Sequence, residues 1–208
     1  MSKARQKIST LPILMGGVVV GYEMARQLGV PVTSLDDAKW LDLTIDGADE
    51  FDPNLALIKG GGAALLQEKI VATASDQMIV ITDAAKEVAQ LGAFPLPVEI
   101  IPFGWQTTKA LVEEMLVSMD VLDRDVTLRM NGDKPLLTDE ANYIVDLHLK
   151  RIGNPRQLAL VLNQIPGVVE NGLFIDICDI VIIGHGDGRV QVRDINNGTQ
   201  TDDRIHFA

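Results

Sequence analysis

The chain is poor in cysteine, in aromatic residues and in positive charge. Among 208 residues there is one cysteine, 4% are aromatic, and 18 lysines and arginines stand against 29 acidic residues, giving a net charge of −11. The single cysteine, Cys178, allows no internal disulfide and makes the reducing cytoplasm the expected location. Excess negative charge disfavours nucleic acid and anionic membranes as partners. It also repels phosphates at long range, so any phosphate site must be built locally from lysines and backbone N–H groups.

The sequence contains no apolar run long enough to cross a membrane. Its only membrane-like stretch is the ten-residue segment Leu11–Val20, about half of the ~20 residues that a spanning helix needs. Basic residues precede it, as in a signal peptide, but no small-residue cleavage site follows cleanly after Gly21. We therefore expect a buried strand at Val18–Val20, followed by a short helix over Tyr22–Leu28.

Strand-like and helix-like segments alternate along much of the chain. Leu41–Ile45, Met78–Thr82 and Asp179–Ile183 are apolar and rich in β-branched residues, as buried strands are. Ala63–Ala74 is a run of helix-forming residues. This alternation favours a Rossmann-like α/β fold, with a mostly parallel sheet and helices on both faces. The apolar content of 47% is enough for one full core and a small satellite domain.

The pattern changes after three prolines at positions 95, 97 and 102. The next segments read as strand, helix, strand, strand and helix, over Val98–Ile101, Thr107–Met119, Val126–Met130, Tyr143–Leu149 and Pro155–Gln164. This order predicts a small α+β domain of the ferredoxin-like kind. Because Asp179–Ile183 should return to the first sheet, the small domain is expected to be an insertion. Residues 1–97 and 172–208 then form the Rossmann-like domain, and residues 98–171 form the small one.

Most of the candidate chemistry lies in residues 46–70, DGADEFDPNLALIKGGGAALLQEKI. Asp46 and Asp49 follow the strand Leu41–Ile45, and parallel sheets bind their ligands beyond the carboxyl ends of strands. Lys86 follows the next strand in the same way. We therefore expect these three side chains at one edge of the sheet.

The second half of this stretch joins a lysine, a bare backbone and a helix. Lys59 precedes Gly60–Gly62, and the helix Ala63–Ala74 begins directly afterwards. Free N–H groups and a partial positive charge at a helix N-terminus suit an anion. Glu68 has small neighbours on its helix face, which leaves room for a ligand. The opposite face is expected to pack on the sheet through Leu66, Ile70 and Thr73.

Without further information, these residues also allow interpretations in which they have no catalytic role. Carboxylates beside an Asp-Gly turn are common at strand ends, and a helix glutamate is often a surface residue. A calcium loop is disfavoured because Ala48 occupies a position that needs an oxygen ligand. No His or Cys lies near enough in sequence to complete a transition-metal site. Residues 184–188, GHGDG, have the wrong spacing for a dinucleotide loop, and Arg189–Val192 reads as a strand, so we expect a hairpin turn there.

Residues 46–70 resemble the core motif of the type A ribose-5-phosphate isomerase family. Other segments similar to this family are Asp83–Lys86, Leu91–Glu99, Ile165–Val169 and Asp179–Gly184. The resemblance extends over roughly residues 22–192. It implies an isomerase that interconverts D-ribose 5-phosphate and D-ribulose 5-phosphate in the non-oxidative pentose phosphate pathway. It also implies a homodimer or homotetramer.

The implied reaction moves one hydrogen between C1 and C2 of a sugar. It needs a base beside a carbon-bound proton and an electrophile that stabilises an enediolate oxygen, with no metal or redox cofactor. By resemblance, Glu68 is the general base, Asp46 and Asp49 bind the sugar and shuttle protons, and Lys59 contacts the oxyanion. The implied substrate-binding set is Asp46, Gly47, Ala48, Asp49, Lys59, Gly60, Gly61, Gly62 and Lys86.

The first twenty residues depart from the family pattern. Members usually carry a Gly-Thr-Gly-Ser-Thr loop that holds the substrate phosphate, whereas Met15–Val18 has no hydroxyl groups. We therefore expect an atypical, short N-terminus without this loop. Two alternative hypotheses follow: a catalytically weak module that senses sugar phosphates, and an isomerase with relaxed specificity for unphosphorylated sugars. The sequence has no helix-turn-helix or other effector domain, which counts against the sensor.

Overall fold

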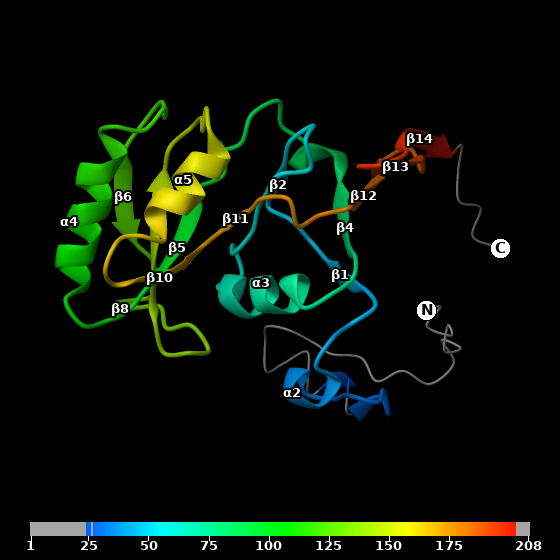
Figure 1. The fold of residues 1–208 in the computed structure, drawn as a ribbon, viewed down its shortest axis with the longest axis horizontal. Helices are drawn as coiled ribbons and strands as arrows, with labels where there is room; N and C mark the ends of the chain where they lie inside the picture. The colour runs from blue at the N-terminus through cyan, green and yellow to red at the C-terminus, as the bar shows by residue number, and fades with distance from the viewer. Residues whose placement is uncertain (1–23, 26, 203–208) are drawn as a thin grey trace, which may run out of the picture.

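The computed structural model describes residues 24, 25 and 27–202, and two larger sheets organise them (Figure 1). The first sheet has the strand order β1-β4-β12-β13-β14. Its strands span Thr44–Asp46, Met78–Asp83, Ile180–Gly184, Val190–Asp194 and Gly198–Asp202. β1, β4 and β12 run parallel, and β13 and β14 extend them antiparallel. This arrangement confirms the predicted α/β class with a parallel core.

Alternation along the central strands buries one set of aliphatic side chains. Val80, Val181 and Ile183 are fully buried. Ala72, on helix α3 (Leu65–Thr73), belongs to the same cluster of packed residues. Helix α3 therefore covers this face of the sheet and is held close to the carboxyl end of β1.

A small sheet of order β11-β3-β2 stands between the two larger ones. Its strands are Glu50–Phe51 (β2), Leu57–Ile58 (β3) and Leu173–Phe174 (β11). β3 and β11 are antiparallel, so the chain returning from the second large sheet lies beside β3. The backbone N–H of Lys59 donates to the carbonyl of Gly172 at 2.9 Å. Two segments far apart in sequence thus fix the backbone of Lys59.

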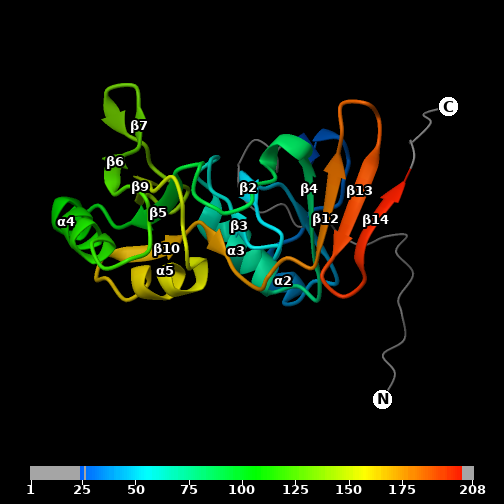
Figure 2. The ribbon, with the colours of Figure 1, turned by 90° about the horizontal axis from the view of Figure 1, so that it is seen from above.

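The second large sheet is antiparallel, in the order β10-β5-β9-β6. Its strands are Leu96–Ile100 (β5), Asp125–Leu128 (β6), Tyr143–His148 (β9) and Val168–Asn171 (β10), with helices Trp105–Leu116 (α4) and Pro155–Leu162 (α5). Along the chain these elements follow the β-α-β-β-α-β order of ferredoxin-like folds. Figure 2 shows them on one side of α3 and the first sheet on the other. The division of the chain into two domains stays a prediction.

The short elements agree with their local sequence signals. Asn154 caps α5, and its side chain accepts from the N–H of Gln157, with proline at the first helical position. Gly184 and Val190 pair across the β12–β13 hairpin, which confirms the predicted turn at residues 184–188. The remaining short elements are Leu35–Ala38 (α2), Ala84–Lys86 (η2), Met130–Asn131 (β7) and Lys134–Pro135 (β8).

The predictions for the start of the chain are only partly within the described region. The expected strand at Val18–Val20 lies outside it, and so do Met15–Val18, where the phosphate loop was expected to be missing. Of the expected helix over Tyr22–Leu28, Met24, Ala25 and Gln27 are helical. Across residues 24, 25 and 27–202, no helix is long and apolar enough to cross a bilayer.

Candidate active site

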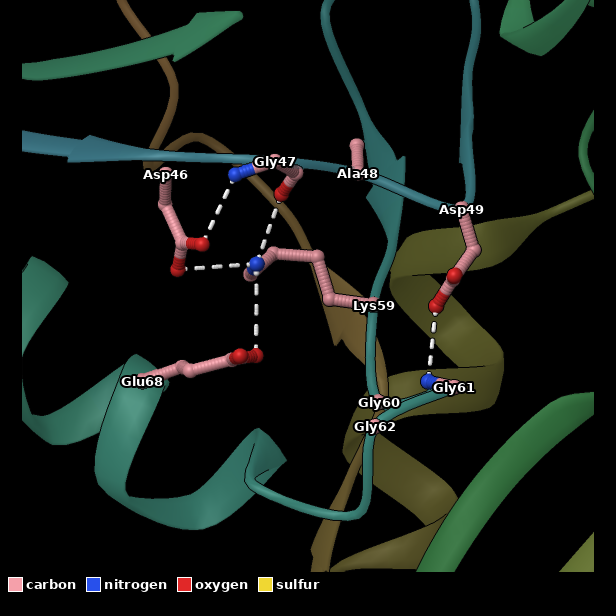
Figure 3. A pocket seen from close by; sticks show the side chains of 9 residues that line it. All are labelled: Asp46, Gly47, Ala48, Asp49, Lys59, Gly60, Gly61, Gly62 and Glu68. Carbon is pink, nitrogen blue, oxygen red and sulfur yellow. Dashed lines mark hydrogen bonds and ion pairs between the residues drawn. The ribbon is translucent and has the colours of Figure 1, made fainter. Parts of the chain in front are cut away.

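Lys59 stands at the centre of the candidate site and bridges two carboxylates (Figure 3). Its Nζ lies 2.8 Å from Asp46 Oδ2 and 3.2 Å from Glu68 Oε2, and it donates to the carbonyl of Gly47 at 2.6 Å. Lys59 is only 3% exposed. A buried ammonium needs such compensation, because an unpaired charge in the interior is strongly destabilising.

The backbone that follows β1 orients the Asp46 carboxylate. The N–H of Gly47 donates to Asp46 Oδ1 at 2.7 Å, which leaves Oδ2 for Lys59. Both oxygens of Asp46 are thus engaged, and the side chain is held between β1 and β3. The Gly47 N–H at the end of the strand therefore helps to point the carboxylate toward the lysine.

Asp49 reaches the glycine loop from the opposite side. Its Oδ2 accepts a hydrogen bond from the N–H of Gly61 at 2.8 Å. A Cβ at Gly61 would lie 2.7 Å from Asp49 Oδ1, a distance that real side chains do not tolerate. Gly60 has φ of 107°, in the region that favours glycine. Glycine at these two positions therefore lets the loop approach the carboxylate closely.

Glu68 lies on the buried side of α3, which corrects one expectation from the sequence. Leu65 and Ala72 are the buried residues of this helix, whereas Ile70 is 48% exposed. The predicted packing face of Leu66, Ile70 and Thr73 is therefore wrong. The helix is rotated so that Glu68 points inward toward Lys59, and a carboxylate cannot enter the interior without such a partner.

Burial raises the pKa of the Glu68 carboxyl above its ordinary value of 4.5, against the opposing pull of the Lys59 ammonium. The nearby charges of Asp46 and Asp49 raise the same pKa further. Glu68 Oε2 is buried and has no aligned hydrogen bond among the described residues. Its contact with Lys59, at 3.2 Å, is an ion pair. The carboxylate is close to a cation and yet is not fully satisfied, as a proton acceptor should be.

The sequence did not indicate the residues that support Lys59 and helix α3 on the side away from the cavity-lining loop. Lys69, next to Glu68, donates to the carbonyl of Asn171 at 2.5 Å and to Glu170 Oε1 at 3.0 Å. Lys59 and Lys69 both stand over the ring of Phe174, 5.5 Å and 4.9 Å from its centroid. These partners lie more than a hundred residues away along the chain, so no local pattern could have indicated them.

One cavity of about 210 Å³ is lined by nearly all the residues that the sequence predicted for catalysis and substrate binding. It is lined by Asp46, Gly47, Ala48, Asp49, Lys59, Gly60, Gly61, Gly62 and Glu68. Lys86 is not among these lining residues; it lies in η2, after β4, and its role stays a prediction. Within the described part of the chain, no group of three or more His, Cys, Asp or Glu side chains is arranged to hold a metal ion.

The site combines a carboxylate of raised pKa, an ammonium and backbone N–H groups around one cavity. Such a set can remove a proton from carbon and stabilise the negative oxygen that results. On this α/β fold, it defines an enzyme of the aldose–ketose isomerase class. The chain belongs to the ribose 5-phosphate isomerase A family: the model of "Ribose 5-phosphate isomerase A (phosphoriboisomerase A)" matches residues 21–188.

Similar proteins agree with this assignment. The chain is 74% identical to ribose-5-phosphate isomerase A of Ruegeria pomeroyi over 186 residues, which cover 89% of this chain and 71% of that protein. It is 78% identical to the enzyme of the same name from Cereibacter sphaeroides over 173 residues, 83% of this chain and 69% of that one. These matches confirm the family to which the sequence motifs pointed.

Solved structures show the same fold. Ribose 5-phosphate isomerase from Plasmodium falciparum has a TM-score of 0.80 at 33% identity, covering 87% of this chain and 77% of that chain. A D-ribose-5-phosphate isomerase in complex with phospho-erythronic acid has a TM-score of 0.73 at 40% identity, covering 88% and 74%. The family and the fold thus rest on both sequence and structure.

Proposed function

We propose that this chain interconverts D-ribose 5-phosphate and D-ribulose 5-phosphate through an enediolate, as an enzyme of the pentose phosphate pathway. The observation that carries the proposal is the pairing of Glu68 with Lys59 in a cavity that also holds Asp46, Asp49 and the glycine loop. The names of the relatives support the substrate. The complex of one of them with phospho-erythronic acid, a phosphorylated sugar acid, supports a sugar-phosphate ligand.

Glu68 acts as the base in this proposal. It takes the proton from C2 of the aldose and returns it to C1, which yields the ketose. Its raised pKa makes the carboxylate a stronger base than a solvated glutamate, and a base works best with a pKa nearer the operating pH.

Lys59 stabilises the enediolate oxygen in this proposal. An ammonium has three donors, and here Asp46, Gly47 and Glu68 surround it. The contact with Glu68, at 3.2 Å, is the longest of the three. A substrate oxygen can therefore replace it at the lowest cost. The exchange would bring the oxyanion to Lys59 and free Glu68 for the proton on carbon.

Asp46 and Asp49 handle the sugar hydroxyls in this proposal. Both are acceptors that a hydroxyl group can approach from the cavity, and both can exchange protons with the ring oxygen when the furanose opens. The bond from Gly61 to Asp49 fixes one oxygen of that carboxylate. Asp46 is fixed by Gly47 and Lys59 in the same way.

The test is an assay of ribose 5-phosphate without added cofactor, in which ketose formation is followed by NMR. We expect turnover, and an unchanged rate after exhaustive EDTA treatment. Binding without turnover would select the sensor hypothesis. A rate abolished by EDTA and restored by a divalent ion would show that the acidic residues near Asp46 bind a metal.

The phosphate end of the substrate is a separate question. A phosphate dianion needs several donors, each charge-assisted contact contributing about 1.5–3 kcal/mol. Because Met15–Val18 lacks the family's hydroxyls, we propose weak discrimination between ribose 5-phosphate and ribose. The measurement is the ratio of the two kcat/KM values, before and after a Gly-Thr-Gly-Ser-Thr loop is grafted onto the N-terminus. A strong preference for the phosphorylated sugar that the graft does not change would refute the idea.

We also propose a cytoplasmic location and assembly into a homodimer or homotetramer. Cys178, the single cysteine of the chain, is free and buried, as is common for proteins of reducing compartments. The assembly is an expectation taken from the family resemblance and is tested by mass in solution.

A further inference from the structure

The backbone of the glycine loop is held by a side chain that the reaction scheme does not include. Arg129 directly follows β6 of the antiparallel sheet and precedes β7. Its Nη1 donates to the carbonyl of Gly60 at 2.8 Å and to the carbonyl of Gly61 at 3.2 Å. Gly60 and Gly61 line the candidate active site. A residue that follows a strand of the second large sheet therefore contacts the site's backbone directly.

Asp146 on β9 holds the other edge of this guanidinium. Arg129 Nε donates to Asp146 Oδ2 at 2.9 Å, and Nη2 donates to Asp146 Oδ1. The side chains of the two residues are only 15% and 16% exposed. The backbone of Arg129 is fixed as well, by bonds to Ile144 and Leu136. A planar fork with two anchored edges is rigid, and lysine could not supply it.

This rigidity reaches the site through the geometry of the peptide bond. In a trans peptide the C=O and the following N–H point in opposite directions. Holding the carbonyl of Gly60 therefore directs the N–H of Gly61 toward Asp49, to which it donates at 2.8 Å. Holding the carbonyl of Gly61 likewise turns the N–H of Gly62 away from Arg129. The guanidinium charge also polarises both peptides, which strengthens their N–H groups as donors.

We propose that Arg129, braced by Asp146, is a positioning residue for the isomerase reaction. It sets the direction and strength of the N–H groups that the glycine loop presents to Asp49 and to the cavity. A role confined to joining β6 and β9 would need only the pair with Asp146. Instead, one nitrogen is committed to two carbonyls of the loop. The expected effect of Arg129 on catalysis rests on the proposed function. Its expected effect on the glycine loop does not.

The first test compares Arg129→Met with Arg151→Met. Arg151 forms a similar forked pair with Asp120, but that pair is more exposed, at 35% and 62%, and neither residue lines the cavity. We expect Arg129→Met to lower kcat by about 10- to 100-fold, since misplacing site groups by about 1 Å can cost about 100-fold, with a smaller change in KM. Arg151→Met should stay within about twofold of wild type. A kcat for Arg129→Met within twofold of wild type would overturn the proposal.

A second test separates positioning from loss of folded protein. Guanidinium ion at millimolar concentration should raise the kcat of Arg129→Ala, and sodium chloride at equal ionic strength should not. The kcat of Arg151→Ala should not respond to either salt. Guanidinium weakens folding in general, so a merely destabilised variant would lose activity in it. Absence of rescue in folded Arg129→Ala would count against the positioning role.

A third measurement does not depend on activity. In protein labelled with 15N-glycine, the amide resonances of Gly61 and Gly62 should shift in Asp146→Asn, which keeps the volume of the side chain but weakens the brace. They should stay unchanged in Arg151→Met. Unshifted Gly61 and Gly62 amides in Asp146→Asn would overturn the proposal. If the Gly61 and Gly62 amides shift in Asp146→Asn but the wild type does not isomerise ribose 5-phosphate, the proposed function alone would be overturned.

Discussion

Glu68 is the residue at which catalysis and stability oppose each other most directly. Its pKa is raised in the folded protein, chiefly by burial, so the fold favours its protonated form. Stability linked to this group is therefore greatest below about pH 4.5 and is lost as the pH rises through the folded pKa. At neutral pH the ionised base costs free energy, as active-site groups often do.

Glu68→Gln removes that charge and keeps the shape of the side chain. We expect turnover to fall by at least ~10², the lower end of general-base effects. We also expect a higher Tm than wild type at neutral pH, with the difference vanishing below about pH 4.5. Glu113→Gln, at a half-exposed surface position on α4, is the control and should change neither value. Near-normal turnover of Glu68→Gln would refute the assignment of the base.

The pH dependence of the reaction gives an independent test of the same residue. Glu68 accepts a proton only when it is ionised, so kcat/KM should rise with pH through its pKa in the free enzyme. Because burial raises that pKa, we expect the midpoint of the acidic limb to lie above the ordinary value of 4.5. An acidic limb centred at or below 4.5 would mean that a different, solvated carboxylate is the base.

At the scale of elements, the site depends on three segments meeting: the end of β1, the loop after β3, and the start of α3. β1 delivers Asp46, and the turn after it delivers Asp49. The chain after β3 delivers Lys59 and the glycines, which lead straight into α3 and Glu68. The loop therefore controls two things at once, the contact with Asp49 and the starting point of the catalytic helix.

Gly61→Ala tests this dependence on the loop. The added Cβ would lie 2.7 Å from Asp49 Oδ1, so either the carboxylate or the loop must move. We expect kcat/KM to fall by about 10- to 100-fold with a small change in Tm, because the clashing atom is the end of a side chain. Gly186→Ala, in the β12–β13 turn where a Cβ meets nothing within 4 Å, is the matched control. Equal activity of the two variants would show that the close approach at Gly61 is not needed.

At the scale of the whole molecule, one face of the first sheet carries exposed aliphatic side chains. Ile45 on β1 pairs in register with Ile79 on β4. Ile45 and Ile81 are 59% and 53% exposed, and alternation puts both on the same face. Neighbouring exposed isoleucines are the kind of surface that association covers.

We therefore expect a homodimer or homotetramer in solution. Light scattering at micromolar concentration should give a mass that is a multiple of the 22.6 kDa of one chain. By mass action, an oligomer dissociates when it is diluted. We expect the oligomer to persist at micromolar concentration, so that the measured mass falls only at much lower concentration. A mass near 22.6 kDa at micromolar concentration would refute the oligomer.

Local signals in the sequence determined much of this protein. β-branched runs predict the central strands because such side chains suit a pleated, buried surface. The Asn154-Pro155 helix start and the hairpin at residues 184–188 each follow from the conformations that a few neighbouring residues allow. The family motif at residues 46–70 named eight of the nine residues in the cavity for substrate binding and also named Glu68. All these signals act over short distances along the chain.

Only the tertiary structure decided how those residues are oriented and supported. The rotation of α3, predicted wrongly, depends on which face buries more apolar area and on whether Glu68 can find Lys59. The supports come from far along the chain: Arg129 reaches Gly60 across 69 residues, and Lys69 reaches Asn171 across 102. Contacts of this kind depend on how two sheets pack, and no local pattern encodes that packing. The sequence therefore determined the chemistry of the site, and the fold determined its geometry.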